Sequence, residues 1–172
     1  MPRAHSTAGS LLLVLSLFVW AGLVAGISFL EAPLKFTAPH ITVPLGLGIG
    51  RIVFAALNKL ELALSATALL SAAVRRAPAH VWAALGLLSA VLLLQTLWLL
   101  PALDLRATAL LAGHPPLPSN LHKTYIGLEV VKLLTLLLAG SWAYQWALRA
   151  QPQMPATAQQ QPQRAGFYLL SK

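Results

Sequence analysis

Two long apolar stretches of this sequence carry ionisable side chains well inside the run. Residues 46–72 include Arg51, Asn58, Lys59 and Glu61. Residues 121–148 include His122, Lys123, Tyr125, Glu129 and Lys132. Both stretches are long enough to cross a bilayer as helices, and charges at such depth are costly unless the protein itself receives them. We therefore expect the two helices to face each other and to define a polar site within the membrane.

The spacing of these polar residues places them on single helix faces. In the later stretch the intervals are three, four and three positions, for His122, Tyr125, Glu129 and Lys132. In the earlier stretch Arg51, Asn58 and Ser65 recur every seven positions. Glu61 follows Asn58 by three positions, whereas Lys59 points to the side. A polar face of this kind must look into the bundle, because lipid cannot satisfy its hydrogen bonds.

The two polar faces also match in depth. Counted from the basic residue at the outer end of each helix, at about 1.5 Å per residue, Glu61 lies about 15 Å deep and Lys132 about 14 Å deep. We expect these two side chains to form an ion pair near the bilayer midplane, with Lys59 and Glu129 close above them. Two acids and two lysines would make a neutral network. The predicted intramembrane polar site consists of Asn58, Lys59, Glu61, Gln95, Tyr125, Glu129 and Lys132.

A second cluster is expected near the outer rim of the membrane. Its members are Glu31, Lys35, Arg51, His122 and Lys123. Ordinary pairing at the headgroup interface is the alternative interpretation of this cluster. For the buried network two interpretations also remain open. Its ion pairs either only fix helix packing, or they form a site that binds a small polar substrate or relays protons.

The elements that position these residues are membrane-spanning helices. Of the 172 residues, 58% are hydrophobic and 9% are charged, whereas a soluble domain carries about 25% charged residues. Spans are predicted at residues 11–30, 46–72, 81–100 and 121–148. The predicted fold is all-α, an integral membrane bundle of four transmembrane helices within one domain, residues 11–148. The first span exceeds the signal-peptide core of about 7–15 residues, so we expect it to be retained.

The connecting segments contain residues that predict helix ends. Three prolines within residues 31–45 predict a non-helical loop or a re-entrant segment. Pro101 predicts the end of the third span, and a separate interfacial helix is expected to begin at Asp104 and to end before Gly113. Residues 149–172, which are rich in Gln, Pro and Ala, are expected to form a disordered tail.

The distribution of basic residues predicts the orientation of the chain. Four spans place both termini on one side of the membrane, which would hold Arg3, Arg75, Arg76, Arg149, Arg164 and Lys172. The opposite loops would hold Lys35, Arg106 and Lys123, with Arg51 at the membrane edge. Because cytoplasmic loops carry an excess of Lys and Arg, we expect the N-terminal segment 1–10 and the tail 149–172 to be cytoplasmic.

Several kinds of chemistry are disfavoured by the composition. The absence of cysteine argues against disulfide scaffolds, Fe–S clusters and cysteine-based zinc sites. The five histidines are too dispersed for a haem between helices or a metal site, so we expect no cofactor and no metal. No catalytic motif is present, so the sequence favours a non-enzymatic role. The net charge of +8 is scattered over helix ends, which argues against a nucleic-acid partner.

Three segments resemble small four-helix proteins of bacterial inner membranes that are known only as hypothetical proteins. The segments read GISFLEAPLKFTAP, GLGIGRIVFAALNKLELALS and HKTYIGLEVVKLL, and they lie within about residues 25–65 and 122–135. The resemblance implies a four-helix fold and a bacterial inner membrane. It implies no activity.

These observations favour a small transporter or binding component with a charge-paired site between the second and fourth helices. The alternative is a structural or assembly protein whose polar network only fixes helix packing, and a small membrane enzyme is the third hypothesis. The lipid bilayer is the expected partner. The glycines of the first two spans also leave room for a homo-oligomer or another membrane subunit.

Overall fold

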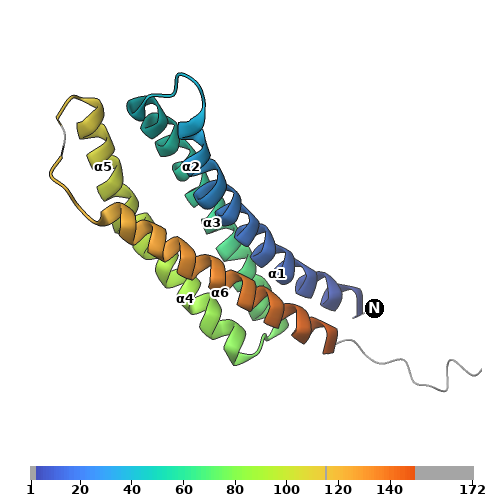
Figure 1. The fold of residues 1–172 in the computed structure, drawn as a ribbon. Coiled ribbons are helices and arrows are strands. Elements are labelled where there is room, and N and C mark those ends of the chain that lie inside the picture. Colours follow the sequence, from blue (N-terminus) through green and yellow to red (C-terminus); the bar gives the residue numbers. More distant parts are fainter. Residues whose placement is uncertain (1–2, 115, 150–172) are drawn as a thin grey trace, which may run out of the picture.

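The computed structural model describes residues 3–114 and 116–149, and this part of the chain forms helices and no strands. Four of its helical stretches are long and apolar enough to cross a membrane, and they pack into one bundle (Figure 1). They comprise Ala8–Thr37, Val43–Arg75, Ala79–Leu111 and Leu121–Arg149. The all-α four-helix fold predicted from the sequence is therefore confirmed.

The first helical stretch is longer than predicted in both directions. Helix α1 (Arg3–Val24) begins within the segment expected to precede the span, and a π-helical segment η1 (Ala25–Glu31) follows it. The short helices α2 (Ala32–Leu34) and η2 (Lys35–Thr37) continue the same rod. The predicted loop from residue 31 is therefore wrong in its first part. Proline breaks an α-helix by clashing with the carbonyl four residues earlier, and the wider π-turn before Pro33 moves that carbonyl aside.

The third stretch shows the same departure. Helix α4 (Ala79–Leu94) leads into a π-helical segment η3 (Gln95–Leu99) and then into α5 (Leu100–Leu111). The predicted end at Pro101 is wrong, because this proline lies in the first turn of α5, just after a π-helical segment. Asp104 consequently lies inside α5 and is not an N-cap. Gly113 does lie just past the helix end, with φ of 81°, a backbone conformation that glycine adopts without strain.

The two helices that carry most of the polar residues are uninterrupted. Helix α3 (Val43–Arg75) begins after Thr42, whose side chain accepts a hydrogen bond from the amide of Leu45 at 3.4 Å. Pro44 lies in its first turn, where a missing N–H is tolerated. Helix α6 (Leu121–Arg149) ends the described part of the chain. The tail predicted to be disordered lies, beyond Arg149, outside the described residues.

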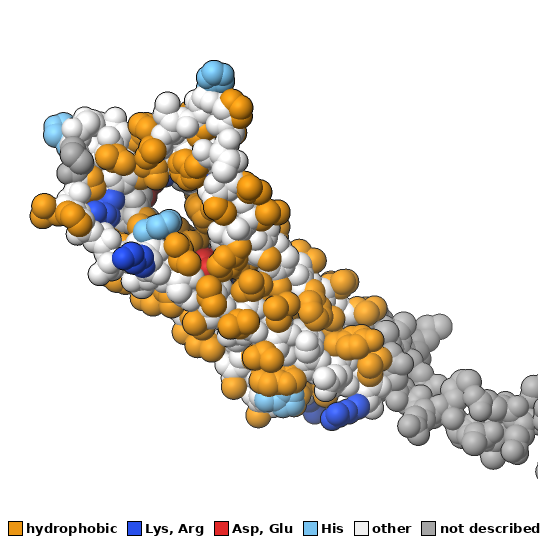
Figure 2. All heavy atoms as spheres, in the orientation of Figure 1, with side chains coloured by type: hydrophobic (Ala, Val, Ile, Leu, Met, Phe, Trp, Pro, Cys, Tyr) orange, Lys and Arg blue, Asp and Glu red, His pale blue; other side chains and the backbone are white. Residues whose placement is uncertain are grey.

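The packing order places α3 and α6 diagonally across the bundle. Helices α1 and α4 each pack against both α3 and α6, and the start of α1 and the end of α6 lie at the same end of the bundle (Figure 1). Between that end and the middle, an apolar core contains Leu13, Leu17, Leu85, Leu88 and Leu136, among others. Apolar side chains also cover the outer surface, and a hollow separates α5 from the rod of α1 at the opposite end (Figure 2).

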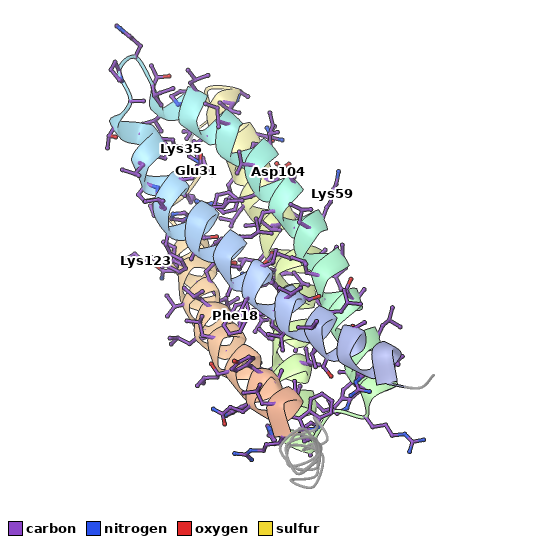
Figure 3. The ribbon with its side chains drawn as sticks, turned by 90° about the vertical axis from the view of Figure 1, so that its right-hand side faces the viewer. Phe18, Glu31, Lys35, Lys59, Asp104 and Lys123 are labelled. Atoms are coloured by element: carbon purple, nitrogen blue, oxygen red, sulfur yellow. The ribbon has the colours of Figure 1, made fainter. Side chains whose placement is uncertain are left out.

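Close packing of α1 against α6 depends on Gly140. A Cβ at this position would lie 3.0 Å from the ring of Phe18 on α1, a residue labelled in Figure 3. We expect Gly140→Leu to lower the free energy of unfolding by about 1–3 kcal/mol, because the ring and the helix must move apart. Thermal unfolding in detergent measures this effect. Gly127→Leu is the matched control on the same helix, since nothing lies within 4 Å of its added Cβ; equal losses in both variants would contradict the prediction.

Candidate functional site

The centre of the buried polar network is the ammonium group of Lys132, whose side chain is 0% exposed. Its Nζ lies 2.6 Å from Oε1 of Glu61 on α3 and 2.7 Å from Oε1 of Glu129 on α6. It also donates a hydrogen bond to Oε1 of Gln95 at 2.8 Å. These three partners match the three N–H donors of a lysine ammonium. The ion pair between Glu61 and Lys132 is thus present, as the sequence predicts.

The two carboxylates differ in the number of donors that they receive. Glu61 receives Lys132 and the indole N–H of Trp20 from α1, at 2.8 Å, both on Oε1. Glu129 receives Lys132 and the amide of Gln95 on Oε1, and the hydroxyl of Ser28 on Oε2, the last two at 2.8 Å. Glu129 therefore accepts contacts from three donor groups, whereas Glu61 accepts contacts from two. All four membrane-length helices contribute a side chain to this network.

Both π-helical segments meet the network at Glu129. Ser28 belongs to η1 and Gln95 to η3, and each donates a hydrogen bond to that carboxylate. A π-turn inserts one extra residue into a helix and re-aims the side chains around it, and such turns are frequent at functional sites. Two separate helices thus depart from α-helical geometry at the level of one glutamate.

Two predicted members lie at the border of the network. Asn58 is 8% exposed and donates a hydrogen bond to the hydroxyl of Thr96 at 2.8 Å, so it ties α3 to η3. Tyr125 is 6% exposed, and its ring packs edge-on against Phe54 with 5.5 Å between ring centres. Both side chains are buried beside the charged network, and no ion pair involves them.

The prediction that Lys59 belongs to the network is wrong. Its side chain is exposed and points away from the bundle (Figure 3). Lysine directs its flexible stem toward water wherever it can, and Lys59 lies one position, about 100° around the helix, from the inward-facing Asn58. The expected balance of two acids and two lysines is therefore lost. The buried network contains two carboxylates, Glu61 and Glu129, and one ammonium, Lys132.

The predicted outer-rim cluster separates into smaller pieces. Glu31 and Lys35 form an ion pair at 3.5 Å, with the lysine also over the ring of Phe54 at 5.5 Å. Arg51 binds Asp104 through two contacts of 2.5 and 3.0 Å, which ties α3 to α5. His122 and Lys123 are exposed on α6, and Lys123 points away from the other members (Figure 3). The five residues do not form one cluster.

Three residues of the network are not among those predicted: Trp20, Ser28 and Thr96. Trp20 is fully buried, and a buried indole N–H requires an acceptor. A tryptophan in the middle of an apolar span, far from the headgroup level where this residue is common, is the signal that identifies it. Ser28 and Thr96 give no such signal, because hydroxyls in membrane helices commonly bond to their own backbone.

Within the described residues, no group of three or more His, Asp or Glu side chains is arranged to hold a metal ion. No family model matches the sequence, and comparisons with curated proteins and with solved structures also give no match. The resemblance to bacterial inner-membrane proteins therefore stays a prediction. The arguments about function rest on the charges and hydrogen bonds of the network.

Proposed function

We propose that this protein is a multi-pass protein of the bacterial inner membrane that binds a proton at its buried network, as a small transporter or binding component. Both termini face the cytoplasm in this proposal. The segments on the side of the termini carry six Lys and Arg residues, Arg3, Arg75, Arg76, Arg149, Arg164 and Lys172, whereas the opposite segments carry Lys35, Arg106 and Lys123, with Arg51 at the membrane edge. This asymmetry supports the orientation, because Lys and Arg accumulate on the cytoplasmic side.

One observation carries the proposal: two carboxylates share one ammonium, and all three groups are buried. Glu61, Glu129 and Lys132 are 2%, 1% and 0% exposed. If both carboxyl groups were ionised, the network would hold one uncompensated negative charge inside the bundle, which costs several kcal/mol. A proton on one carboxyl removes that charge. A network that only fixed helix packing would need a single acid opposite its lysine.

The size of the site favours a proton over a larger solute. The N–H groups of Lys132 are occupied by protein acceptors, and the members of the network touch one another directly. A proton needs no cavity, since it replaces a lone pair with an O–H bond. The carboxyl that holds it is Glu61, because Glu129 receives more donors and is the better stabilised carboxylate.

In this proposal the proton reaches the network from the outer face along α6. Tyr125 precedes Glu129 by one turn and is the one other titratable side chain buried on this helix face in the described chain. A hollow lies between α5 and the rod of α1 at the outer end of the bundle (Figure 2). The proton is exchanged at this outer end, with the tyrosine hydroxyl between the hollow and the carboxylates.

A structural role is the second candidate, and one observation favours it. Every member of the charged network has at least one direct partner, and the network is buried. If packing were its only purpose, removing the excess acid by Glu61→Gln would stabilise the protein without any functional loss, because neutral replacements of buried ionic groups are often stabilising. The two candidates therefore differ in what the excess carboxyl does.

Infrared spectroscopy of the full chain in liposomes tests for the proton, since a protonated carboxyl absorbs apart from a carboxylate. We expect one buried protonated carboxyl per chain at neutral pH. Glu61→Gln is expected to remove its band, because Glu129 then has Lys132 to itself. Lys132→Gln is expected to double the band. Asp104→Asn is the control and should leave the band unchanged, because Asp104 is half-exposed and paired with Arg51.

The absence of a protonated carboxyl from the wild-type spectrum would contradict the proposal. The structural role would instead be supported by two results together. The band of the protonated carboxyl would stay unchanged in deuterated water, because its proton exchanges slowly, and Glu61→Gln cells would keep the full wild-type phenotype. Loss of the phenotype in Glu61→Gln cells, at normal protein level, supports proton binding as the function.

A further inference from the structure

The cytoplasmic end of the bundle has cations without acidic partners. Arg75 and Arg149 lie there, and the four acids of the whole sequence, Glu31, Glu61, Asp104 and Glu129, lie in the middle or at the other end. Arg75 donates a hydrogen bond to the hydroxyl of Ser10 at 3.0 Å, and its guanidinium lies over the ring of Trp146 at 5.9 Å. Within the described residues, no Asp or Glu side chain lies at this end to balance these cations.

A polar pocket of about 250 Å³ opens at this end between α4 and α6. It is lined by Pro78, His80, Trp142, Gln145, Trp146 and Arg149. Arg149 and His80 offer N–H donors that suit a phosphate, and the amide of Gln145 adds a further donor. The tryptophan rings are typical of the headgroup level of a membrane.

An apolar pocket of about 320 Å³ continues the polar one toward the middle of the bundle. His80 and Trp142 line both, with their rings edge to face at 5.4 Å. The apolar pocket extends along Ala84 and Leu87 of α4 and Leu138 of α6. It therefore follows the helices inward for about two turns, or about 11 Å. The lower end of the molecule in Figure 2 shows a histidine beside basic side chains, under a band of apolar ones.

We propose that these two pockets form one groove that binds an anionic phospholipid of the inner leaflet. The phosphate lies at Arg149 and His80, and one acyl chain lies along Ala84, Leu87 and Leu138. The polar pocket is at the end of the spans, where headgroups are, and the apolar pocket points toward the hydrocarbon. Basic pockets between helices on the cytoplasmic side have the chemistry that selects anionic headgroups. The inference depends on the membrane-spanning fold, the charges and the proposed orientation, and it does not depend on the proton site.

The test measures binding of phosphatidylglycerol and phosphatidylcholine to the full chain in detergent by native mass spectrometry. We expect the anionic lipid to bind about tenfold more tightly, as for one charge-assisted contact. Arg149→Gln is expected to remove this preference. Arg76→Gln is the matched control, because it removes a cation at the same end that does not line either pocket, and it should change binding less than about twofold.

A third variant tests the acyl part of the groove. Ala83 is exposed and lines the apolar pocket, so Ala83→Phe should weaken phosphatidylglycerol binding about tenfold and leave glycerol phosphate binding unchanged. Equal effects of Arg149→Gln and Arg76→Gln would overturn the proposal in favour of general surface charge. Absence of a preference for the anionic lipid, or a second protein chain bound in place of lipid, would also overturn it.

Discussion

Replacement of Lys132 by methionine is expected to lower the free energy of unfolding by about 3–5 kcal/mol, the cost of removing one partner from a buried ion pair. The ammonium contacts Glu61, Glu129 and Gln95 at 2.6–2.8 Å. Methionine fills a similar volume, so the loss reports the charge and not a cavity. Without the lysine, the two buried carboxyl groups must take protons or remain charged inside the bundle.

This loss should depend on pH in a defined direction. In the folded Lys132→Met protein both carboxyl groups hold a proton, whereas in wild type one does, so unfolding at neutral pH releases two protons from the variant and one from wild type. Because the folded state then binds more protons than the unfolded state, stability falls as pH rises, by about 1.4 kcal/mol per pH unit for each such proton. The measurement is thermal or denaturant unfolding in detergent at several pH values, compared with wild type.

Two further variants separate the charge effect from a general effect of substitution. Lys132→Met combined with Glu61→Gln and Glu129→Gln should regain most of the lost stability, because a neutral set replaces the ionic one. Lys59→Met makes the same change on the exposed face of α3 and should stay within about 0.5 kcal/mol of wild type. A Lys132→Met protein as stable as Lys59→Met would mean that the ammonium does not neutralise the carboxylates.

The helical fold and the ion pair of Glu61 with Lys132 were predictable from the sequence because both follow from regular helix geometry. Period and rise are the same in any α-helix, so residues far apart in the chain can be compared in depth and face. The pairing holds although α3 and α6 lie diagonally in the bundle and meet through long side chains.

The charge balance of the site was not predictable from spacing. Lys59 is next to Asn58 in sequence. A small rotation of α3 about its own axis therefore decides whether the lysine side chain points into the bundle or away from it. Its exposed position leaves the network with an excess acid, and this excess is the observation on which the proton proposal depends. Counting charges per span cannot replace knowing which side of the helix each one occupies.

The helix ends at Pro33 and Pro101 were misread for a physical reason. Proline ends an α-helix because the α-helical turn leaves no room for its ring. Here η1 and η3 precede the two prolines and widen that turn. The same two segments carry Ser28 and Gln95 to Glu129. The two π-helical segments that made the predicted helix ends wrong therefore also position side chains of the site.

The polar contribution of α1 was missed because this span has no polar face to reveal its orientation. Trp20 is the largest fully buried side chain, and its indole N–H lies 2.8 Å from Oε1 of Glu61. We expect Trp20→Ala to lower the free energy of unfolding by about 3–5 kcal/mol, as large-to-small changes in a core do. Trp20→Phe keeps most of the ring and removes the donor, so a loss of about 1.5–3 kcal/mol is expected.

Trp98→Phe is the control for the second substitution, since Trp98 is 53% exposed and should tolerate it without loss. A double-mutant cycle of Trp20→Phe with Glu61→Gln, measured by thermal unfolding in detergent, isolates the contact itself. The carboxylate is the acceptor that makes this hydrogen bond strong, so the loss on Trp20→Phe should shrink by about half or more once Glu61 is neutral. Additive losses would mean that Trp20 contributes packing alone, and that Glu61 has one donor and not two.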